Sequence, residues 1–163
     1  MRSAKIKNDS IFGQQLFLDW DLYQLLGIDG PDGTDWRLST DYLSERGFAF
    51  GTSYRYNLPR TFLPGPATGF FDAWGLSDRG LDTLGSDRVD LFPERDTRGR
   101  ITLRHRQYLT PDWELWAELG MISDRNFLEQ FFEREWDEEK DFTTALRLRH
   151  YRDNQLLDIL GQP

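Results

Sequence analysis

The chain of 163 residues has 28 acidic and 20 basic residues and a formal net charge of -8, which argues against nucleic acid as a partner because phosphates attract basic surfaces. It has no cysteine and two histidines, which excludes disulfides and thiolate metal sites and leaves little for a metal cluster. No stretch approaches the roughly 20 apolar residues of a membrane-spanning helix. The N-terminal segment, residues 1–10, carries positive charge without an apolar core, so it does not predict a secretory signal.

The first part of the chain predicts three strands. Apolar and polar side chains alternate one by one over residues 12–26, 35–44 and 47–57. Successive side chains of a strand point to opposite faces, so this period of two is typical of a strand with one apolar and one polar face. A loop rich in Gly, Pro and Asp separates the first two segments. The segment Ser44–Gly47 predicts a tight turn in which Gly47 can adopt positive φ.

The rest of the chain predicts further strands and one helix. Prolines weaken the pattern between residues 58 and 98. The clearest alternation follows, in two segments joined by a turn at Thr110-Pro111-Asp112. The aromatic residues Phe127, Phe131 and Phe132 recur at helical spacing, which predicts a short amphipathic helix over 124–136. The further strands are expected at 67–76, 88–94, 99–109, 112–122 and 142–151, with a last partial strand at 155–160.

Together these elements predict an all-β fold, an antiparallel meander of about seven or eight strands with one short helical insert. Many of the strands approach the ~9–11 residues that a tilted membrane-spanning strand requires. A soluble sheet with one wet face gives the same alternation as a membrane barrel with a polar lumen. The aromatic content of 15% and the 14 glycines suit a barrel with aromatic girdles, but also a soluble aromatic β domain.

The sequence offers little for catalysis. His105 and His150 both fall in the apolar phase of their strands, which favours sheet-face side chains over members of a catalytic or metal site. There is no calcium-loop spacing and no Gly-rich phosphate loop. We therefore expect no catalytic residue, no metal, no cofactor and no enzyme activity. A hydrolase that uses two of the carboxylates between Glu133 and Glu139 is a lesser alternative.

Two sets of side chains are the candidates for function. If the hairpins pair in chain order, the charged residues of the polar phase share one face and the apolar residues share the other. In a barrel the first set would line the lumen and could guide a polar or anionic substrate, while the second would face lipid. On a soluble sheet the charges would form cross-strand ion pairs worth little each. The candidate lumen-facing residues are Arg55, Arg100, Arg104, Arg106, Glu114, Glu118, Arg147 and Arg149. The candidate lipid-facing residues are Trp36, Phe48, Phe50, Tyr54, Leu103, Leu115 and Leu148.

Two segments carry a resemblance to a known family. Residues 35–47, DWRLSTDYLSERG, resemble an early barrel hairpin of the LPS-assembly protein LptD (organic solvent tolerance) family. Residues 98–141, RGRITLRHRQYLTPDWELWAELGMISDRNFLEQFFEREWDEEKD, are similar to a later part of that barrel, with a His-containing strand, a turn, a Trp-initiated strand and then Ser123-Asp124 followed by aromatic residues. The similarity spans roughly Asp35 to Tyr151, and its most specific part is the block from Ser123 to Trp136.

The resemblance implies a segment of an outer-membrane β-barrel, located in the cell outer membrane, that delivers lipopolysaccharide or a related glycolipid to the outer leaflet. It also implies a lipoprotein plug and a periplasmic bridge protein as partners. The chain departs from the family pattern because it has no signal peptide, no jelly-roll sequence and too little length for the whole barrel, and because it ends on Gly161-Gln162-Pro163 rather than on an aromatic strand. We therefore expect a fragment, or a truncated product, that covers early barrel strands. No gate or plug-contact residues can be transferred.

The alternative is a soluble antiparallel β-sheet domain that binds a ligand such as carbohydrate on its aromatic face. The missing signal peptide and the 29% of charged residues favour it. Burial distinguishes the two interpretations. In a soluble fold a second layer must cover Phe48, Phe50, Tyr54 and Tyr56, whereas in a barrel segment the same side chains face lipid and are exposed in the isolated chain.

Overall fold

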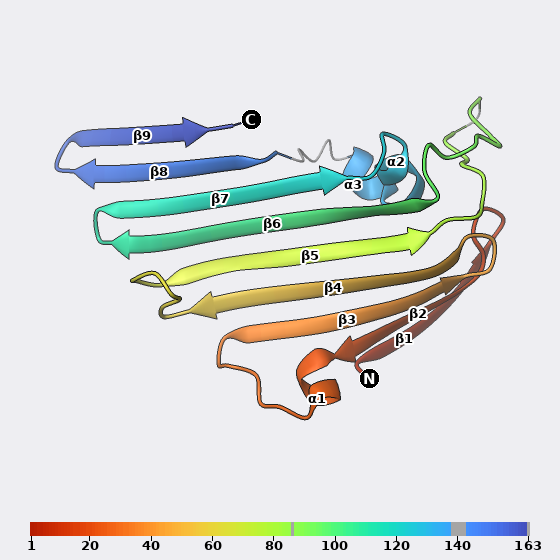
Figure 1. Cartoon of the computed structure of the whole chain (residues 1–163), viewed down its shortest axis with the longest axis horizontal. Coiled ribbons are helices and arrows are strands. Elements are labelled where there is room, and N and C mark those ends of the chain that lie inside the picture. Colours follow the sequence, from red (N-terminus) through yellow and green to blue (C-terminus); the bar gives the residue numbers. More distant parts are fainter. Residues whose placement is uncertain (86, 138–142, 163) are drawn as a thin grey trace.

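Nine strands form a single antiparallel sheet in residues 1–85, 87–137 and 143–162, the parts of the chain that the structure, a computed structural model, describes. The strands lie side by side in chain order, so each pairs with its sequence neighbours (Figure 1). The first and last strands do not pair with each other, and the sheet is open. The strands are β1 (Ser3–Asp9), β2 (Gly13–Asp21), β3 (Thr34–Leu43), β4 (Gly47–Leu58), β5 (Ala67–Ser77), β6 (Thr97–Thr110), β7 (Trp113–Ile122), β8 (Ala145–Arg152) and β9 (Gln155–Gly161).

The all-β antiparallel meander expected from the alternation is confirmed, with nine described strands instead of seven or eight. The alternating segments correspond to β3 through β8, and the last partial strand corresponds to β9. The expected turn residue Gly47 has a φ of 125°. The strand β1 was not expected. Its Ala4 and Ile6 alternate with Lys5 and Lys7, but Ile6 is its only large apolar side chain, so the alternation is too weak to indicate a strand.

Two of the expected strands were wrong, one in its extent and one entirely. The predicted strand at 12–26 ends at Asp21, whose carboxylate accepts a hydrogen bond from the backbone N–H of Gln24 and so begins helix α1 (Leu22–Leu26). Gly27 ends that helix with a φ of 66°. The predicted strand at 88–94 is not formed: Leu91 makes an isolated bridge with Asp82, and the positive φ of 54° at Asp90 breaks the extended backbone.

The predicted helix at 124–136 is instead two short helices, α2 (Phe127–Phe131) and α3 (Glu133–Asp137). Phe132 separates them because its backbone, at φ -135° and ψ 47°, leaves the helical region. The strand expected from residue 142 begins in the structure at Ala145, while residue 142 itself lies outside the described residues. The described part of the chain therefore holds three helices, all of five residues.

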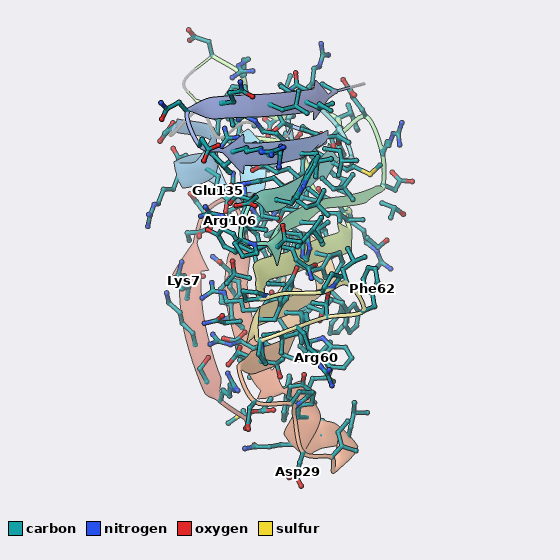
Figure 2. The ribbon with its side chains drawn as sticks, turned by 90° about the vertical axis from the view of Figure 1, so that its left-hand side faces the viewer. Lys7, Asp29, Arg60, Phe62, Arg106 and Glu135 are labelled. Atoms are coloured by element: carbon teal, nitrogen blue, oxygen red, sulfur yellow. The ribbon has the colours of Figure 1, made fainter. Side chains whose placement is uncertain are left out.

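The sheet is curled so that one of its faces lies on the inside. This is the face that carries the charged residues of the alternating pattern, such as Arg55 and Arg106. Viewed from one end, β1 curves back toward the side on which Arg106 of β6 and Glu135 of α3 lie, and Phe62 of the β4–β5 connection lies on the other side (Figure 2). A hollow of about 460 Å³ on this inner side is lined by residues of every strand from β1 to β6, together with Phe131 and Phe132 from the α2 region. The curl therefore makes the polar face the concave one.

A small hydrophobic core lies on the polar face at one end of the sheet. Leu43, Ala49 and Leu76 are buried there although they occupy positions of the polar phase, and Phe127 and Leu128 of α2 pack on them. The helix thus covers one end of the concave face (Figure 1). Among the described residues, this core has no member on the opposite, apolar face.

Candidate functional site

The strand register brings the eight charged candidates together on one face. Directly paired residues of neighbouring strands point to the same side, and Arg55 faces Phe70, which faces Arg104, which faces Glu118. The same phase continues into β8 with Arg147 and Arg149. We call this the polar face; it carries Arg55, Arg100, Arg104, Arg106, Glu114, Glu118, Arg147 and Arg149.

Most of these charges are paired across strands. Arg100 donates to Asp72 at 3.0 Å and also to Glu135 of α3. Arg106 donates to Glu114 and lies over the ring of Trp116, with its guanidinium carbon 4.5 Å from the ring centroid. In β8 and β9, both Arg147 and Arg149 pair with Asp158. Glu114 is buried in its pair. The more exposed pairs, such as those of Asp158, contribute little stability each, but together the pairs give the concave face a balanced ionic surface.

All seven apolar candidates lie on the opposite face, and none is buried. Phe48 is 64% exposed and Phe50 61% exposed. No described helix or loop packs over these two rings as a second layer. We call this the apolar face; it carries Trp36, Phe48, Phe50, Tyr54, Leu103, Leu115 and Leu148, and it continues through Ile6, Leu16, Met121, Leu146 and Ile159.

Aromatic side chains gather at both ends of the apolar face. At one end Tyr42 packs on Phe48 with ring centroids 4.8 Å apart. At the other end Trp36, Tyr54 and Tyr56 form a continuous row, with centroid distances of 6.0 and 5.6 Å. Between these two ends β4 carries Phe50 and Thr52, and Thr52 lies between Leu38 of β3 and Ala73 of β5. The apolar face therefore has aromatic borders at both ends of its strands.

Both histidines lie on the apolar face, as their sequence phase predicts, and each contacts an aromatic ring. His150 stacks on Trp113 at a centroid distance of 4.4 Å. His105 lies 2.5 Å from the Tyr56 hydroxyl through Nδ1 and 3.1 Å from Gln107 Oε1 through Nε2. Buried Gln107 in turn donates to backbone carbonyls of the β4–β5 connection. The contacts of His105 are those of a side chain that holds a loop in place.

A buried ionic cluster, which no pattern in the sequence indicates, lies at the end of the sheet that α2 covers. Arg98 donates to Asp78 at 2.9 Å, to Asp82 at 2.6 Å and to Asp124 at 2.9 Å. Arg46 donates to Asp78 and Asp82 at 3.2 and 3.3 Å. Both arginines are 1% exposed. We call these five residues the ionic cluster; they come from a turn, two loops and a strand that are far apart in sequence, so no motif spacing marks them.

Aromatic rings of the α2 region and of the β1–β2 turn enclose the ionic cluster. The guanidinium carbon of Arg46 lies 5.5 Å from the ring centroids of both Phe12 and Phe131. That of Arg98 lies 5.2 Å from the centroid of Phe131. A guanidinium group is attracted to the face of an aromatic ring, more strongly when water is excluded. The cluster thus joins the β3–β4 turn, the β5–β6 loop and α2 into one cap.

Asp124 is held ionised within this cap. Burial raises the pKa of its carboxyl, but hydrogen bonds from Arg98 and Ser123 and the charge of Arg98 outweigh that effect, so the net pKa lies below the ordinary value. Its second role is local, because it also accepts from the backbone N–H of Asn126, just before α2. Asp124 therefore links the start of α2 to strand β6.

The acidic residues of the described part of the chain do not gather into a metal site. Within that part, no three His, Cys, Asp or Glu side chains are placed to hold a metal ion. Of the acidic run, Glu135 pairs with Arg100, whereas Glu138 and Glu139 lie outside the described residues. In the same part of the chain, no helix has the length and apolar character needed to cross a membrane.

The comparisons with known proteins do not place the chain in a family. No family model matches it, and no curated protein matches it either. The resemblance to the LptD family therefore rests on the residues of the chain itself. What the fold and the two faces define is an all-β protein with an open antiparallel meander, charged on its concave side and apolar on its convex side.

Proposed function

We propose that this chain is a segment of an outer-membrane β-barrel of the LptD type that takes part in transport of lipopolysaccharide or a related glycolipid to the outer leaflet, without catalysis. In this proposal the apolar face contacts lipid and the polar face lines the lumen. The single observation that carries it is the uncovered apolar face, in which Phe48 and Phe50 remain more than half exposed. Large exposed apolar patches of this kind mark contact with a membrane or with another protein.

The length of the apolar face also supports lipid contact. Phe48 and Tyr56 are eight residues apart in β4, which corresponds to about 26 Å along the strand at ~3.3 Å per residue. A strand tilted by about 40° would then span roughly 20 Å of membrane depth, near the ~25 Å apolar band of outer-membrane barrels. The aromatic borders of the face match the aromatic girdles that flank such a band.

The polar face fits a water-filled interior. Its arginines and carboxylates pair with one another across strands, with Arg100–Asp72 and Arg106–Glu114 as examples. A balanced ionic lining would be costly in contact with hydrocarbon but is tolerated in an aqueous lumen. A charged lumen also offers hydrogen-bond donors to the headgroup of an anionic glycolipid.

The alternative, a soluble sheet that binds carbohydrate, requires a second layer over the apolar face. Helix α2 packs instead on the polar face. On the apolar face, Tyr23 of α1 contacts Trp36, and the β4–β5 connection covers Gln107, both near the ends of the strands. Phe48 and Phe50 remain more than half exposed. A partner protein would have to supply that layer. The proposal of lipid contact needs no such partner for this face, and we prefer it for that reason.

Fractionation of cells that express the full-length gene product tests the proposal. We expect the protein in the outer-membrane fraction, resistant to extraction with urea, and we expect its depletion to reduce lipopolysaccharide or glycolipid at the cell surface. Recovery only in the soluble fraction would contradict the proposal. Membrane recovery with unchanged surface glycolipid would retain the barrel and reject the transport role.

A further inference from the structure

A hollow of about 360 Å³ lies in the middle of the polar face, separate from the ionic cluster. It exists because one row of paired residues across four strands has short side chains: Ser53, Asp72, Thr102 and Gly120. The adjacent row is bulky and charged. The short row is thus the floor of the hollow and the charged row is one of its walls.

The charged row places an aromatic ring between two arginines. Arg55 and Arg104 flank Phe70 on the neighbouring strands. The guanidinium carbon of Arg104 lies 6.0 Å from the centroid of the Phe70 ring. Neighbouring strands are ~4.8 Å apart, so the two arginines start about 10 Å apart and are long enough for their guanidinium groups to converge on one ligand.

These two arginines have fewer and longer ion pairs than the other arginine of the hollow. Arg104 is 53% exposed and lies 3.8 Å from Glu118, at the limit of an ion pair. Arg55 is exposed, and within residues 1–85, 87–137 and 143–162 it has no ion-pair partner. By contrast Arg100, at the other wall, is held by Asp72 and Glu135. The lining holds three arginines and three carboxylates, and Arg55 and Arg104 are the two arginines whose guanidinium groups are least engaged by them.

We propose that Arg55, Phe70 and Arg104 form a binding subsite for a phosphorylated sugar. A phosphate has enough anionic oxygens to accept hydrogen bonds from two guanidinium groups at once, and the planar fork of an arginine matches its geometry. The apolar face of a sugar ring can pack on Phe70, above the short row. The hydroxyls of such a sugar can donate to Asp72 and Glu118, which remain partly exposed beside the ring.

This subsite rests on the proposed function for the origin of its ligand, because a lumen that carries a glycolipid would expose the headgroup to it. The shared chemistry is a phosphorylated sugar, whether free or as part of a lipid. Binding by the site itself does not depend on membrane insertion, since the hollow lies on the face opposite the apolar one. The two proposals can therefore fail separately.

Titration calorimetry of the full chain in detergent micelles tests the subsite, with glucose 6-phosphate, glucose and inorganic phosphate as probes. We expect glucose 6-phosphate to bind best of the three. Arg55→Gln and Arg104→Gln should each weaken it about tenfold or more, the typical loss of a charge-assisted hydrogen bond. Phe70→Leu should weaken glucose 6-phosphate but leave inorganic phosphate unchanged.

The matched control is Arg37→Gln, which removes one positive charge from the same face outside the hollow. Arg37 is already paired with Asp35, so this change should leave binding within about twofold. Equal loss in Arg37→Gln and Arg55→Gln would overturn the subsite in favour of a general charge effect. Absence of binding by the wild-type chain, or equal binding of glucose 6-phosphate and phosphate, would overturn it as well.

Competition with a phosphorylated glycolipid in mixed micelles distinguishes the source of the ligand. A glycolipid headgroup should displace glucose 6-phosphate, and the same lipid without its phosphate should not. Displacement by neither lipid would restrict the site to a free sugar phosphate. If the wild-type protein fractionates with the outer membrane but binds no sugar phosphate, the subsite is rejected and the barrel proposal remains intact.

Discussion

Arg98 donates hydrogen bonds to three carboxylates while its side chain is closed to solvent. Burial of charges is costly, and it is tolerated here because every guanidinium nitrogen of Arg98 has an acceptor. The negative charges of the three carboxylates are in turn compensated by the two arginines of the cluster, Arg46 and Arg98. Removal of either arginine would leave buried negative charge without compensation, which is the arrangement that proteins tolerate least.

We predict that Arg98→Met lowers the free energy of unfolding by about 3–5 kcal/mol, the usual cost of breaking a buried ion pair from one side. Urea unfolding in detergent micelles, followed by tryptophan fluorescence, measures the change. The matched control is Arg125→Met, because Arg125 is 81% exposed on the side chain and pairs with Glu94. That variant should lose at most about 1 kcal/mol. Similar losses in both variants would contradict the structural role of the cluster.

Asp124 gives the cap a defined pH dependence. Its pKa is lowered in the folded state, so its contribution to stability is present above its unfolded pKa of about 3.9 and is lost as the pH falls through the folded pKa. We predict that the free energy of unfolding declines below about pH 4 and that Asp124→Asn reduces stability at neutral pH. The gap between wild type and variant should close at low pH; a gap that stays constant from pH 7 to pH 3 rules out this linkage.

At the scale of single residues, the sequence predicted the strand faces better than the buried cluster. The phase of each strand assigned Phe50 and Arg104 to opposite faces, because successive side chains of a strand point to opposite sides of the sheet. Nothing in the spacing of Arg46, Asp82 and Asp124 predicts that they meet. Their contact depends on where two loops fold back over the sheet, and that is set by tertiary packing.

The conformation of the β4–β5 connection depends on a glycine. Gly65 has a φ of 81°, and a Cβ at this position would lie 1.7 Å from the backbone carbonyl oxygen of Tyr108. Gln107 holds the same connection by donating to the carbonyls of Leu63 and Pro64 at 3.0 Å. The loop is therefore fixed to β6 by both close backbone approach and side-chain hydrogen bonds.

We predict that Gly65→Ala destabilises the chain by roughly 2–4 kcal/mol, because it combines a strained left-handed conformation with a clash against backbone. Gly27→Ala is the matched control: its φ is 66°, but a Cβ there meets nothing within 4 Å. It should cost only the conformational part, about 1–2 kcal/mol. Urea unfolding of both variants tests the difference, and equal losses would show that the approach to Tyr108 is not a constraint.

At the scale of elements, strands with a regular period of two were predictable and irregular segments were not. The segments that became β3, β4, β6 and β7 have long alternating runs, and their boundaries lie close to the expected ones. The strand expected at 88–94 failed because its apolar residues were too few to outweigh Pro93 and the left-handed backbone at Asp90. The helical insert divided at Phe132, where packing on Trp74 replaces helical regularity.

As a whole molecule, the chain is an open curled sheet that has different chemistry on its two sides. Its stabilising contacts are concentrated on the concave side, in the ionic cluster and the small core beneath α2. Its convex side is apolar, and Phe48 and Phe50 there remain more than half exposed. The separation of the two faces was predictable from the sequence, because strands paired in chain order keep their phases aligned. The curl and the cap were not, because both depend on contacts between distant segments.

Spin labels on alternating positions of β4 test the central claim, that the convex face contacts lipid and the concave face contacts water. The chain has no cysteine, so each single-cysteine variant carries one label. In protein reconstituted into lipid vesicles, we predict that labels at Phe50, Thr52 and Tyr54 are more accessible to oxygen, which concentrates in hydrocarbon, than to a polar nickel reagent. Labels at Ser53 and Arg55 should show the opposite preference. A stronger response to the nickel reagent at all five positions would contradict the account.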